Sequence, residues 1–503
     1  MVESAGPDVV PVTIVGAGPT GLTLAVELHQ AGVPFRIVDA APDAVHESRA
    51  LAIQARTLEV LDRSGVAAEL VRAGDQARSI GLHAGRTVEV PLFDDANDET
   101  AYPFLLFLSQ AETERILLAW LEQRGVEVER DCSVEAVQPD DGGVTFEVKT
   151  AAGREVRRTG YLVGCDGAHS AVRTQAGISF SGGGFPQSFA IADLDVDGLD
   201  PGHVHAFVSA SGIMFFFPLG SPAAWRLLAM LPGGAASEAL GLADLQHLVD
   251  SHAAGRPGTY RLSAPVWVTT FKVQSRRAER FRRGRVLLAG DAAHIHSPAG
   301  AQGMNTGIQD AVNLGWKLAR VVQDPALDAL LDTYEEERLP IAREVLRSTN
   351  RMFRIATTSN RLVRWLRPRL APIALGILVR SRSARAIGFR TISQIAIHYR
   401  GRTLARSPRQ ATWDGLRAGD RLPDIEVIVG RRVINLRRSL VTPDYLLAGI
   451  NVGPSGEADS IAKSIIGVIP GKPSGWILIR PDGYIAGIWR DIASVKAFLD
   501  VWS

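Results

Sequence analysis

Cysteine and long apolar runs are scarce in this 503-residue chain, and each scarcity excludes a class of protein. The two cysteines, Cys132 and Cys165, are too few for a disulfide framework or a cysteine-rich zinc site, and too far apart for a C-x-x-C redox pair. No apolar run approaches the roughly 20 residues of a membrane-spanning helix. Because the first residues also lack the pattern of a signal peptide, we expect a cytoplasmic protein without a membrane span.

A strong charge of either sign is missing as well. The formal net charge of +1 supplies no general field for nucleic acid or an anionic membrane, so neither is an expected partner. The composition, with 46% apolar and 22% charged residues, is ordinary for a globular protein. At this length, a chain usually divides into roughly two or three domains.

A glycine-rich stretch near the N-terminus is the first chemical signal. GAGPTG, residues 16–21, has G-x-G-x-x-G spacing between a β-branched strand at residues 12–15 and a helix running toward Gln30. Its glycines permit a tight turn, close approach of a pyrophosphate, and close packing of helix on strand. Asp39 ends the next strand, at residues 33–39, where an acid can bind a ribose hydroxyl. This β-α-β unit predicts a dinucleotide site without distinguishing NAD(P) from FAD.

After this unit the pattern of apolar runs and of Gly and Pro residues changes, which indicates further domains. Short strand-like runs separated by Gly and Pro predict a largely antiparallel sheet inserted in the first domain. The predicted domains are residues 1–177 and 274–345 for nucleotide binding, 178–273 for the sheet, 346–405 for an arginine-rich helical segment, and 406–503 for a C-terminal domain. In the arginine-rich segment, the piece LAPIALGILV is interpreted as a buried helix, with a membrane-surface helix as the alternative.

Several single elements can be placed from periodicity and turn residues. A helix is expected from Thr113 to Arg124, followed by a strand from Val126 to Glu129. Another helix is expected over residues 307–322. Near the C-terminus, Pro481-Asp482-Gly483 predicts the turn of a hairpin, and a terminal helix follows it.

Two later motifs distinguish between the dinucleotides. GCDGAHSAVR places Asp166-Gly167 after an apolar strand, and RVLLAGDAAH places Gly290-Asp291 after another, with a P-x-G-x-Q-G-x-N segment behind it. Together with the first glycine motif, they resemble the class A flavoprotein monooxygenases, the aromatic hydroxylases related to p-hydroxybenzoate hydroxylase. The resemblance covers essentially the full length. It is closest to the phenol and polyketide hydroxylases, which add a thioredoxin-like C-terminal domain.

The resemblance implies an α/β fold with three parts. These are a Rossmann-like FAD-binding domain, an inserted and largely antiparallel β-sheet substrate domain, and a C-terminal thioredoxin-like domain. The last lacks C-x-x-C in this chain, so thiol redox chemistry is excluded and a packing or oligomer role is expected. A homodimer is left open.

The resemblance further implies FAD as the bound cofactor and NAD(P)H as a transient reductant. The glycine motif is expected at the pyrophosphate and Asp39 at the adenosine ribose. Gln110 and Asp291 are expected at the ribityl chain. The full set carried over as cofactor-binding is Gly16, Gly18, Pro19, Thr20, Gly21, Asp39, Arg49, Gln110, Val134, Asp166, Asp291, Gly303, Met304 and Asn305.

Some of these residues have a purely structural alternative. Arg49 and Arg56 fit helix-surface arginines, Gln110 fits a cap of the helix after it, and Asp166 fits the start of a helix. The residues alone leave these alternatives open.

The reaction implied by the resemblance is hydroxylation of a phenolic or polycyclic aromatic compound. NAD(P)H reduces FAD, O2 adds to give a flavin C4a-hydroperoxide, and its distal oxygen is transferred to the substrate. The backbone of Pro298 and Gly300 is expected at the reactive edge of the flavin, where apolar walls keep water away. Alternatives are a Baeyer-Villiger or epoxidising monooxygenase on the same scaffold, or a non-catalytic FAD-binding partner protein.

The substrate side is harder to assign from sequence. Alternation in GIMFFFPLG puts Met214, Phe216 and Pro218 on one face, which we predict to contact the aromatic substrate, although both faces also fit core. A phenol needs a base, and the candidates are His203, His205 or Arg226.

The stretch GDAAHIHSPAGAQGMN holds two further points. Asp291, His294 and His296 lack the i, i+4 pairing of a helical metal site, so no metal is expected and the histidines receive no role. Ala301 stands where the family usually has a second glycine. A positive φ there would strain the loop by about 1 kcal/mol or more, and we expect that φ is not positive.

Overall fold

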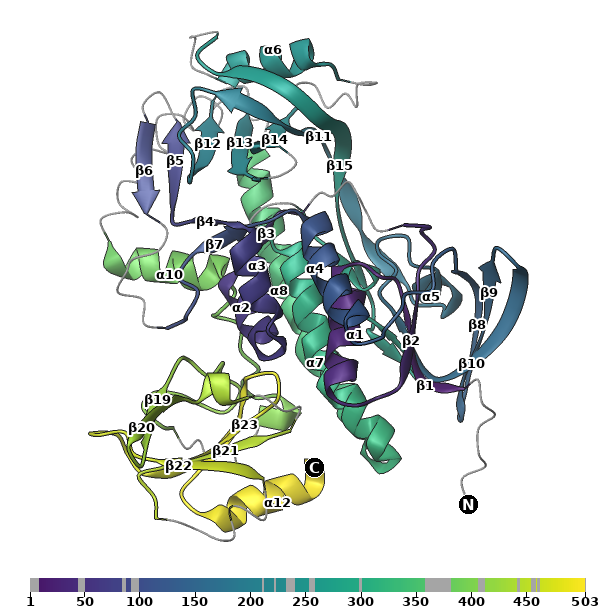
Figure 1. Ribbon diagram of the computed structural model, residues 1–503, viewed down its shortest axis with the longest axis vertical. Coiled ribbons are helices and arrows are strands. Elements are labelled where there is room, and N and C mark those ends of the chain that lie inside the picture. Colours follow the sequence, from purple (N-terminus) through teal and green to yellow (C-terminus); the bar gives the residue numbers. More distant parts are fainter. Residues whose placement is uncertain are drawn as a thin grey trace.

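The structure is a computed structural model. It describes residues 9–43, 50–83, 87–91, 99–209, 212–220, 223–231, 240–252, 258–297, 301–357, 381–405, 412–440, 444–453, 458 and 462–502. Figure 1 shows a nucleotide-binding part with mainly parallel strands, a large twisted sheet above it, and a smaller C-terminal part below. The mixed α/β class expected from the sequence is confirmed.

The nucleotide-binding part is built on a parallel sheet. Its central strands are β10 (Gly153–Gly164), β1 (Val10–Val15) and β2 (Phe35–Val38), with β17 (Val286–Leu288) beside β10 and β16 (Arg282–Arg283) at the edge. Each of the three main strands ends in a buried apolar run, as expected for a sheet covered on both faces. The strand and helix predicted around the glycine motif are confirmed.

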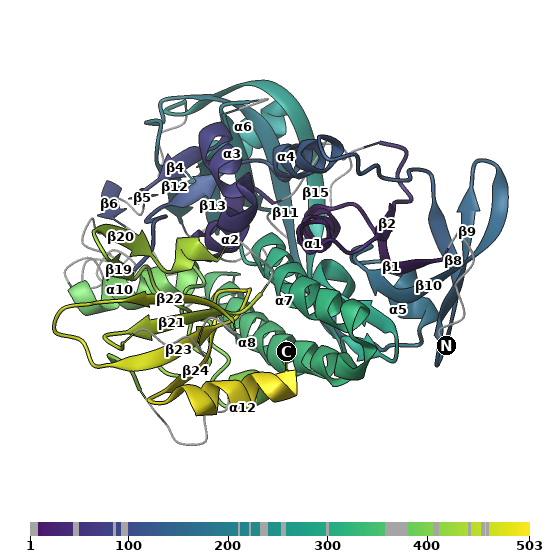
Figure 2. The same ribbon diagram turned by 60° about the horizontal axis from the view of Figure 1, so that its bottom comes forward.

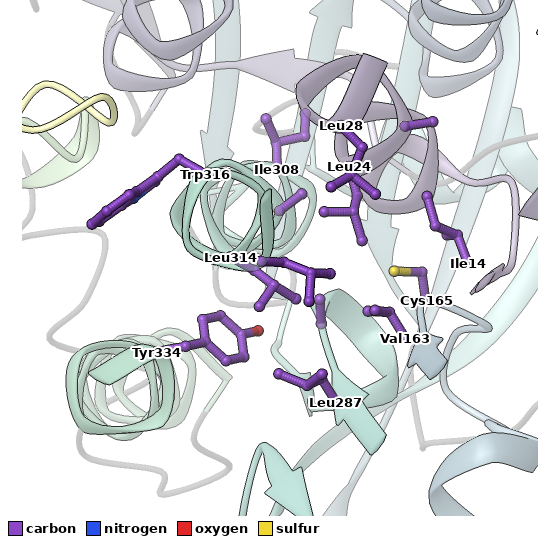
Figure 3. Close-up of a cluster of buried hydrophobic side chains, with 14 of the residues drawn as sticks. Ile14, Leu24, Leu28, Val163, Cys165, Leu287, Ile308, Leu314, Trp316 and Tyr334 are labelled. Carbon is purple, nitrogen blue, oxygen red and sulfur yellow. The ribbon is translucent and has the colours of Figure 1, made fainter. Parts of the chain in front are cut away.

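Two helices cover one face of this sheet and enclose the main core. α1 (Pro19–Gln30) and α7 (Gly303–Gln323) lie side by side. A Cβ on Gly315 of α7 would lie 2.5 Å from the Cβ of Glu27, so glycine lets the two helices approach closely. Figure 3 shows the core between them and the strands, with Ile14, Leu24, Val163, Leu287 and Ile308 pointing inward.

The elements after β2 include one incorrect prediction. α4 (Gln110–Glu122) forms where a helix was expected. The strand predicted from Val126 to Glu129 is wrong, because only Glu129 bridges to Val38 of β2. An antiparallel extension follows, in which β8 (Ser133–Asp140) pairs with β9 (Gly143–Thr150) and β9 with β10.

The large sheet has the strand order β18-β15-β11-β14-β13-β12-β5-β6. Two 18-residue strands, β11 (Phe180–Asp197) and β15 (Arg261–Ala278), run from the nucleotide-binding part into this sheet (Figure 1). The other strands are β12 (Val204–Val208), β13 (Ile213–Pro218), β14 (Trp225–Met230), β18 (His294–Ile295), β5 (Ser79–His83) and β6 (Thr87–Pro91). The sheet is largely antiparallel as predicted, with one parallel pair, β12 with β5.

The range predicted for the sheet domain, residues 178–273, leaves out three strands of this sheet, namely β5 and β6 before it and β18 after it. β5 and β6 precede residue 178, and they join the sheet through the pairing of Val204 with Ile80. The local sequence pattern of residues 79–91 does not predict that β5 pairs with β12, which lies more than a hundred residues later. On the sheet, α6 (Leu242–His252) packs on β13 and β15.

The arginine-rich segment is partly described. α8 (Asp332–Thr357) runs alongside α7, and α10 (Arg382–Ile392) packs near a small sheet of β3 (Ala52–Ile53), β7 (Leu105–Phe107) and β4 (Asp75–Ala77). The piece LAPIALGILV lies outside the described residues. Within the described ranges, no helix combines the length and apolarity that crossing a bilayer requires.

The C-terminal part has its own mixed sheet with the order β22-β21-β23-β24. Its strands are β21 (Leu446–Ile450), β22 (Lys463–Gly467), β23 (Gly475–Ile479) and β24 (Ile485–Trp489), and α12 (Ile492–Trp502) follows (Figure 2). β19 (Glu426–Val429) and β20 (Arg432–Asn435) form a separate hairpin. The predicted hairpin turn and terminal helix are confirmed, and the thioredoxin-like assignment stays a prediction.

Buried charges join the C-terminal part to α7 and α8. Glu337 of α8 accepts hydrogen bonds from Lys317 at 2.7 Å and from Arg480 at 2.6 and 2.9 Å, and Arg480 also donates to Asp482 at 3.0 Å. Asn313 completes this group by donating to Glu337 at 2.8 Å. We call Asn313, Lys317, Glu337, Arg480 and Asp482 the interdomain network. It packs the RPDG turn against α7 and α8, and the role of the C-terminal domain stays a prediction.

Candidate active site

A cavity of about 540 Å³ opens between the nucleotide-binding part and the large sheet. It is lined from one side by the glycine turn and the N-terminus of α7, and from the other by strands of the sheet. Two larger hollows, of about 620 and 680 Å³, are lined largely by charged or polar residues away from the glycine turn. The candidate site is therefore identified by its chemistry rather than by its size.

The glycine turn is shaped for close approach at one end of this cavity. A Cβ on Gly21 would lie 1.9 Å from the carbonyl oxygen of Gly16, so the third glycine is required for packing. At Gly18, by contrast, the nearest atom to a Cβ is a Glu114 carboxylate oxygen at 3.9 Å. Gly18 caps α1 without a side-chain hydrogen bond, so the first amides of the helix are available to an anionic ligand. Pro19 and Thr20 line the cavity beside it.

Asp39 holds this turn in place. Its carboxylate accepts hydrogen bonds from the backbone amides of Ala17 at 2.5 Å and Ala41 at 2.7 Å. The amide of Cys132 donates to the backbone carbonyl of Asp39 at 2.9 Å, so the segment leading to Val134 of β8 runs beside it. The predicted contacts of Asp39 with a ribose and of Val134 with the cofactor stay predictions.

Gln110 lines the cavity, and it meets a carboxyl group that sequence reasoning missed. Its amide nitrogen donates to Glu114 at 2.8 Å. Burial raises the pKa of Glu114 to about 7, and the nearby Asp39 adds to the rise. The helix cap is Ser109, which accepts from the amide of Glu112, so the alternative reading of Gln110 as the cap is wrong. The i, i+4 spacing of Gln110 and Glu114 was a signal for this contact.

The GD motif places Asp291 on the cavity wall. Gly290 has a φ of +63°, and a Cβ there would lie 2.4 Å from the Thr20 hydroxyl oxygen. Only glycine satisfies both conditions, so the turn after β17 presents Asp291 at this point. Gly303 and Met304, at the start of α7, line the same cavity.

Other predicted cofactor residues lie behind the wall. Asn305 donates to the carbonyls of Ala52 at 2.8 Å and Ala301 at 2.9 Å, and it accepts from the amide of Gln54. It therefore ties the start of α7 to β3. Asp166 accepts from the Ser170 hydroxyl and the amide of Val172, but Ser170 is the cap of α5 (Ala171–Gln175), so Asp166 does not begin this helix. The cofactor role of Asp166 stays a prediction.

Three predicted residues are not placed. Arg49, Pro298 and Gly300 lie outside the described residues. Arg56 is buried away from the cavity, where it donates to the carbonyl of Asp482 at 2.7 Å in the contact with the C-terminal part. The surface alternative for Arg56 is therefore wrong.

The prediction for the substrate face chose the wrong side of β13. Met214 and Phe216 are fully buried in a core with α6, and Pro218, on the same face, is buried too. Phe217, on the opposite face, lines the cavity and stacks on Phe107 with ring centroids 5.7 Å apart. The period-2 pattern identified two faces correctly, but α6 decided which one is covered. The apolar wall is completed by Leu51, Ile191, Leu228, Phe271 and Val273.

The structure also places two of the three candidate bases outside the cavity wall. His203 and His205 do not line the cavity: His203 contacts the Ser79 hydroxyl, and His205 contacts His83 at 3.0 Å. Arg226 does line it, but its Nε and Nη2 donate to the Asp193 carboxylate at 2.6 and 2.7 Å, and its Nη1 donates to the carbonyl of Ala50 at 3.3 Å. Arginine side chains are not deprotonated in proteins, so this residue type does not serve as the base.

The histidines of the GD stretch form a buried chain that sequence reasoning did not assign. His296 lines the cavity and bonds to His294 at 2.8 Å; His294 bonds to Asp310 at 2.6 Å. Asp310 in turn accepts from Arg338 of α8 at 2.6 Å. We call His296, His294, Asp310 and Arg338 the histidine chain. Its two last members lie on helices that no local pattern connects with the histidines.

Ala301 departs from what we expected. Its φ is +50°, in the left-handed region that favours glycine. The expectation of a harmless substitution is therefore wrong, and the methyl group carries strain of about 1 kcal/mol. Ala301 stays in this conformation because Asn305 and the apolar cluster near Leu51 hold the loop.

Within the described ranges, no three His, Cys, Asp or Glu side chains are grouped as metal ligands. The parallel sheet, the glycine turn opening onto a cavity, and the acid at the end of a second strand together define a dinucleotide-binding fold.

Comparisons with known proteins agree with this class. Residues 9–349 match a family model described as an FAD binding domain. The chain is 35% identical to a 6-methylpretetramide 4-monooxygenase from Streptomyces rimosus, over 96% of this chain and 91% of that protein. It is 30% identical to a pentachlorophenol 4-monooxygenase from Sphingobium chlorophenolicum, over 96% of this chain and 87% of that protein.

A solved structure matches across the same length. The OxyS anhydrotetracycline hydroxylase from Streptomyces rimosus has a TM-score of 0.77 and 30% identity, covering 98% of this chain and 99% of that one. The chain belongs to the FAD-binding-domain family of flavin-dependent aromatic and polyketide monooxygenases. The predicted family and the predicted cofactor, FAD, are confirmed.

Proposed function

We propose that this enzyme uses NAD(P)H and O2 to hydroxylate a phenolic or polycyclic aromatic compound. The observation that carries the proposal is the composition of the cavity. One end has the glycine turn and Asp291, and the other has stacked aromatic rings with one fixed arginine. The relatives support the substrate class, because their names give a polycyclic pretetramide and a chlorinated phenol as substrates.

The residues present fit FAD. Open space at Gly18, uncapped amides at the start of α1, and Asp291 on the same wall suit a pyrophosphate followed by a ribityl chain. Gly303 and Met304 would provide backbone for the flavin ring. Bound FAD would supply the chemistry, namely acceptance of hydride from NAD(P)H and transfer of one oxygen atom of O2 to the substrate.

The chain's own side chains would bind and orient the substrate. The apolar wall around Phe107 and Phe217 excludes water and packs on an aromatic ring. Arg226 is buried and held by Asp193, so it can donate a hydrogen bond to a substrate oxygen without moving. A rigid cation of this kind favours substrates whose reacting ring carries a hydroxyl or a carbonyl group.

The direct test is anaerobic stopped-flow reduction of the purified yellow protein by NADPH and by NADH, with and without a panel of phenols. We expect reduction that a bound phenol accelerates, and a product that has gained one oxygen atom by mass spectrometry. A protein that keeps FAD but is reduced by neither nucleotide under any condition would falsify the proposal.

Asp291 offers a site test that needs no substrate. Asp291→Ala removes the carboxylate expected at the ribityl chain, so we expect the purified variant to lose most of its FAD absorbance. Asp244→Ala is the matched control, because Asp244 is exposed on α6 and lies far from the cavity residues. A variant at position 291 that keeps a full complement of flavin contradicts the assignment.

A further inference from the structure

The histidine chain ends at His296, which lines the cavity and has one ring nitrogen without a hydrogen-bond partner among the described residues. His296 Nδ1 is buried and has no hydrogen-bond partner among the described residues. The other ring nitrogen, Nε2, lies 2.8 Å from His294 Nδ1, and His294 Nε2 lies 2.6 Å from the Asp310 carboxylate. A buried polar nitrogen without a partner calls for an explanation, and here its ring forms part of the substrate cavity wall.

The partners in the chain determine which nitrogen carries each proton. Burial alone would raise the pKa of Asp310, but Arg338 and His294 outweigh it and hold the pKa below its usual value. An ionised Asp310 only accepts, so His294 Nε2 donates to it. With Nε2 of His294 as the donor to Asp310, its Nδ1 can accept a hydrogen bond from Nε2 of His296. In that arrangement, a neutral His296 leaves its unpaired Nδ1 as an acceptor with a free lone pair.

The groups around His296 favour the neutral form of its ring. Burial and the neighbouring His294 lower the pKa of His296 well below its ordinary value; Asp310 opposes this and Arg338 adds to it. His294 belongs to β18, Asp310 to α7 and Arg338 to α8, and Arg276 of the neighbouring strand β15 lines the same cavity. On the far side, Arg338 also donates to the Tyr399 hydroxyl at 3.0 Å, which fixes its position.

We propose that His296 Nδ1 is the base that takes the proton from a phenolic substrate, and that His294 and Asp310 position it and stabilise the charge. The proposal rests on the function proposed above. In the step, the phenol O–H bond breaks and a His296 Nδ1–H bond forms, while the Nε2 proton of His296 passes to His294 Nδ1. The products are a phenolate and a His294 imidazolium beside the Asp310 carboxylate, so charge and protons balance.

The first test reads the protons directly and needs no substrate. Histidine labelled with ¹⁵N in the FAD-loaded enzyme reports which ring nitrogens are protonated, and His296→Gln assigns the signals of that residue among the 11 histidines. We expect an unprotonated Nδ1 and a protonated Nε2 on His296 at neutral pH. A protonated Nδ1 would overturn the proposal.

The second test separates proton removal from cofactor function. In His296→Gln, the glutamine amide can still donate toward His294 but cannot transfer a proton. With phenol, 4-nitrophenol and 1-naphthol as probes, we expect FAD content and the rate of reduction by NADPH to stay within about twofold of wild type. Product formed per NADPH consumed should fall by about 100-fold, and the fall in product formation toward acid pH should disappear.

His247→Gln is the matched control, because His247 is exposed on α6 outside the cavity. It should leave reduction, coupling and the pH profile unchanged. If wild type is not reduced at all, the proposed function fails while the NMR result still decides the proton positions. If wild type hydroxylates a probe and His296→Gln does so with the same coupling and pH profile, only the histidine assignment fails.

Discussion

The histidine chain and the interdomain network are both fully or largely buried, both contain carboxylates bound to arginine, and they share the helices α7 and α8. They differ at their ends. In the interdomain network, each charged group has an opposite charge within hydrogen-bonding distance: Lys317 and Arg480 meet Glu337, and Asp482 meets Arg480. In the histidine chain, one end is closed by Arg338, and the other end is His296, a residue of the cavity wall whose Nδ1 has no hydrogen-bond partner among the described residues.

This difference indicates different roles for similar chemistry. In the closed network every charged group is paired, so no group is left to exchange a proton with a ligand. Its ion pairs hold the C-terminal part against the nucleotide-binding part and contribute specificity of packing. A network with one open end at a ligand cavity can pass a proton. If this difference matters, breaking the fully paired interdomain network should lower stability, and breaking the unpaired end of the histidine chain should lower activity.

The largest effect is expected from breaking the closed network. Glu337→Leu leaves Lys317 without its buried counter-charge, so we expect the free energy of unfolding to fall by about 3–5 kcal/mol. Urea denaturation followed by tryptophan fluorescence measures it. Lys472→Met is the control, because the pair of Lys472 with Asp414 is exposed and should cost under about 1 kcal/mol. Equal effects of the two variants would contradict a special role for burial.

The same network should set part of the acid limit of stability. Burial alone would raise the pKa of Glu337, but Arg480 and Lys317 lower it to about 2, from an ordinary value of 4.5. The unfolded state therefore binds more protons between these values. The stability contributed by Glu337 is complete above about pH 4.5 and is lost as the pH falls toward 2. Denaturation curves across this range should show a shallower loss in Glu337→Leu than in wild type.

A moderate gain in stability is expected beside the open end of the histidine chain. Ala301→Gly removes a methyl group from a residue with a φ of +50°, so we expect the free energy of unfolding to rise by about 0.5–1 kcal/mol. Thermal unfolding of the FAD-free protein measures it without a contribution from the cofactor. Gly303→Ala, whose φ is not in the left-handed region, provides the contrast and should not stabilise. An unchanged or lower stability of the position-301 variant shows that packing outweighs the strain.

The smallest effect on stability is expected where the effect on catalysis is largest. His296→Gln disturbs one hydrogen bond at the open end of the chain, so the free energy of unfolding should change by under about 1 kcal/mol. A loss as large as that of Glu337→Leu, measured in the same urea experiment, would place His296 among the stabilising residues instead.

The sequence by itself determined the class of this protein. The glycine turn, the DG motif and the GD motif depend on local backbone geometry, as at Gly21 and Gly290, where any Cβ meets another atom. Local geometry is encoded by neighbouring residues, so strand, turn and helix around each motif could be predicted. The hairpin at Pro481-Asp482-Gly483 was predictable for the same reason.

Only the tertiary structure decided the rest. Which face of β13 meets the cavity depends on α6, and the fate of His203 and His205 depends on the pairing of β12 with β5. The histidine chain needs Asp310, which lies 16 residues after His294, and Arg338, which lies 28 residues after Asp310. Periodicity and spacing report the neighbours of a residue along its own element. Periodicity and spacing do not show which other element packs against a residue, because packing partners are set by the burial of the apolar faces of whole helices and sheets.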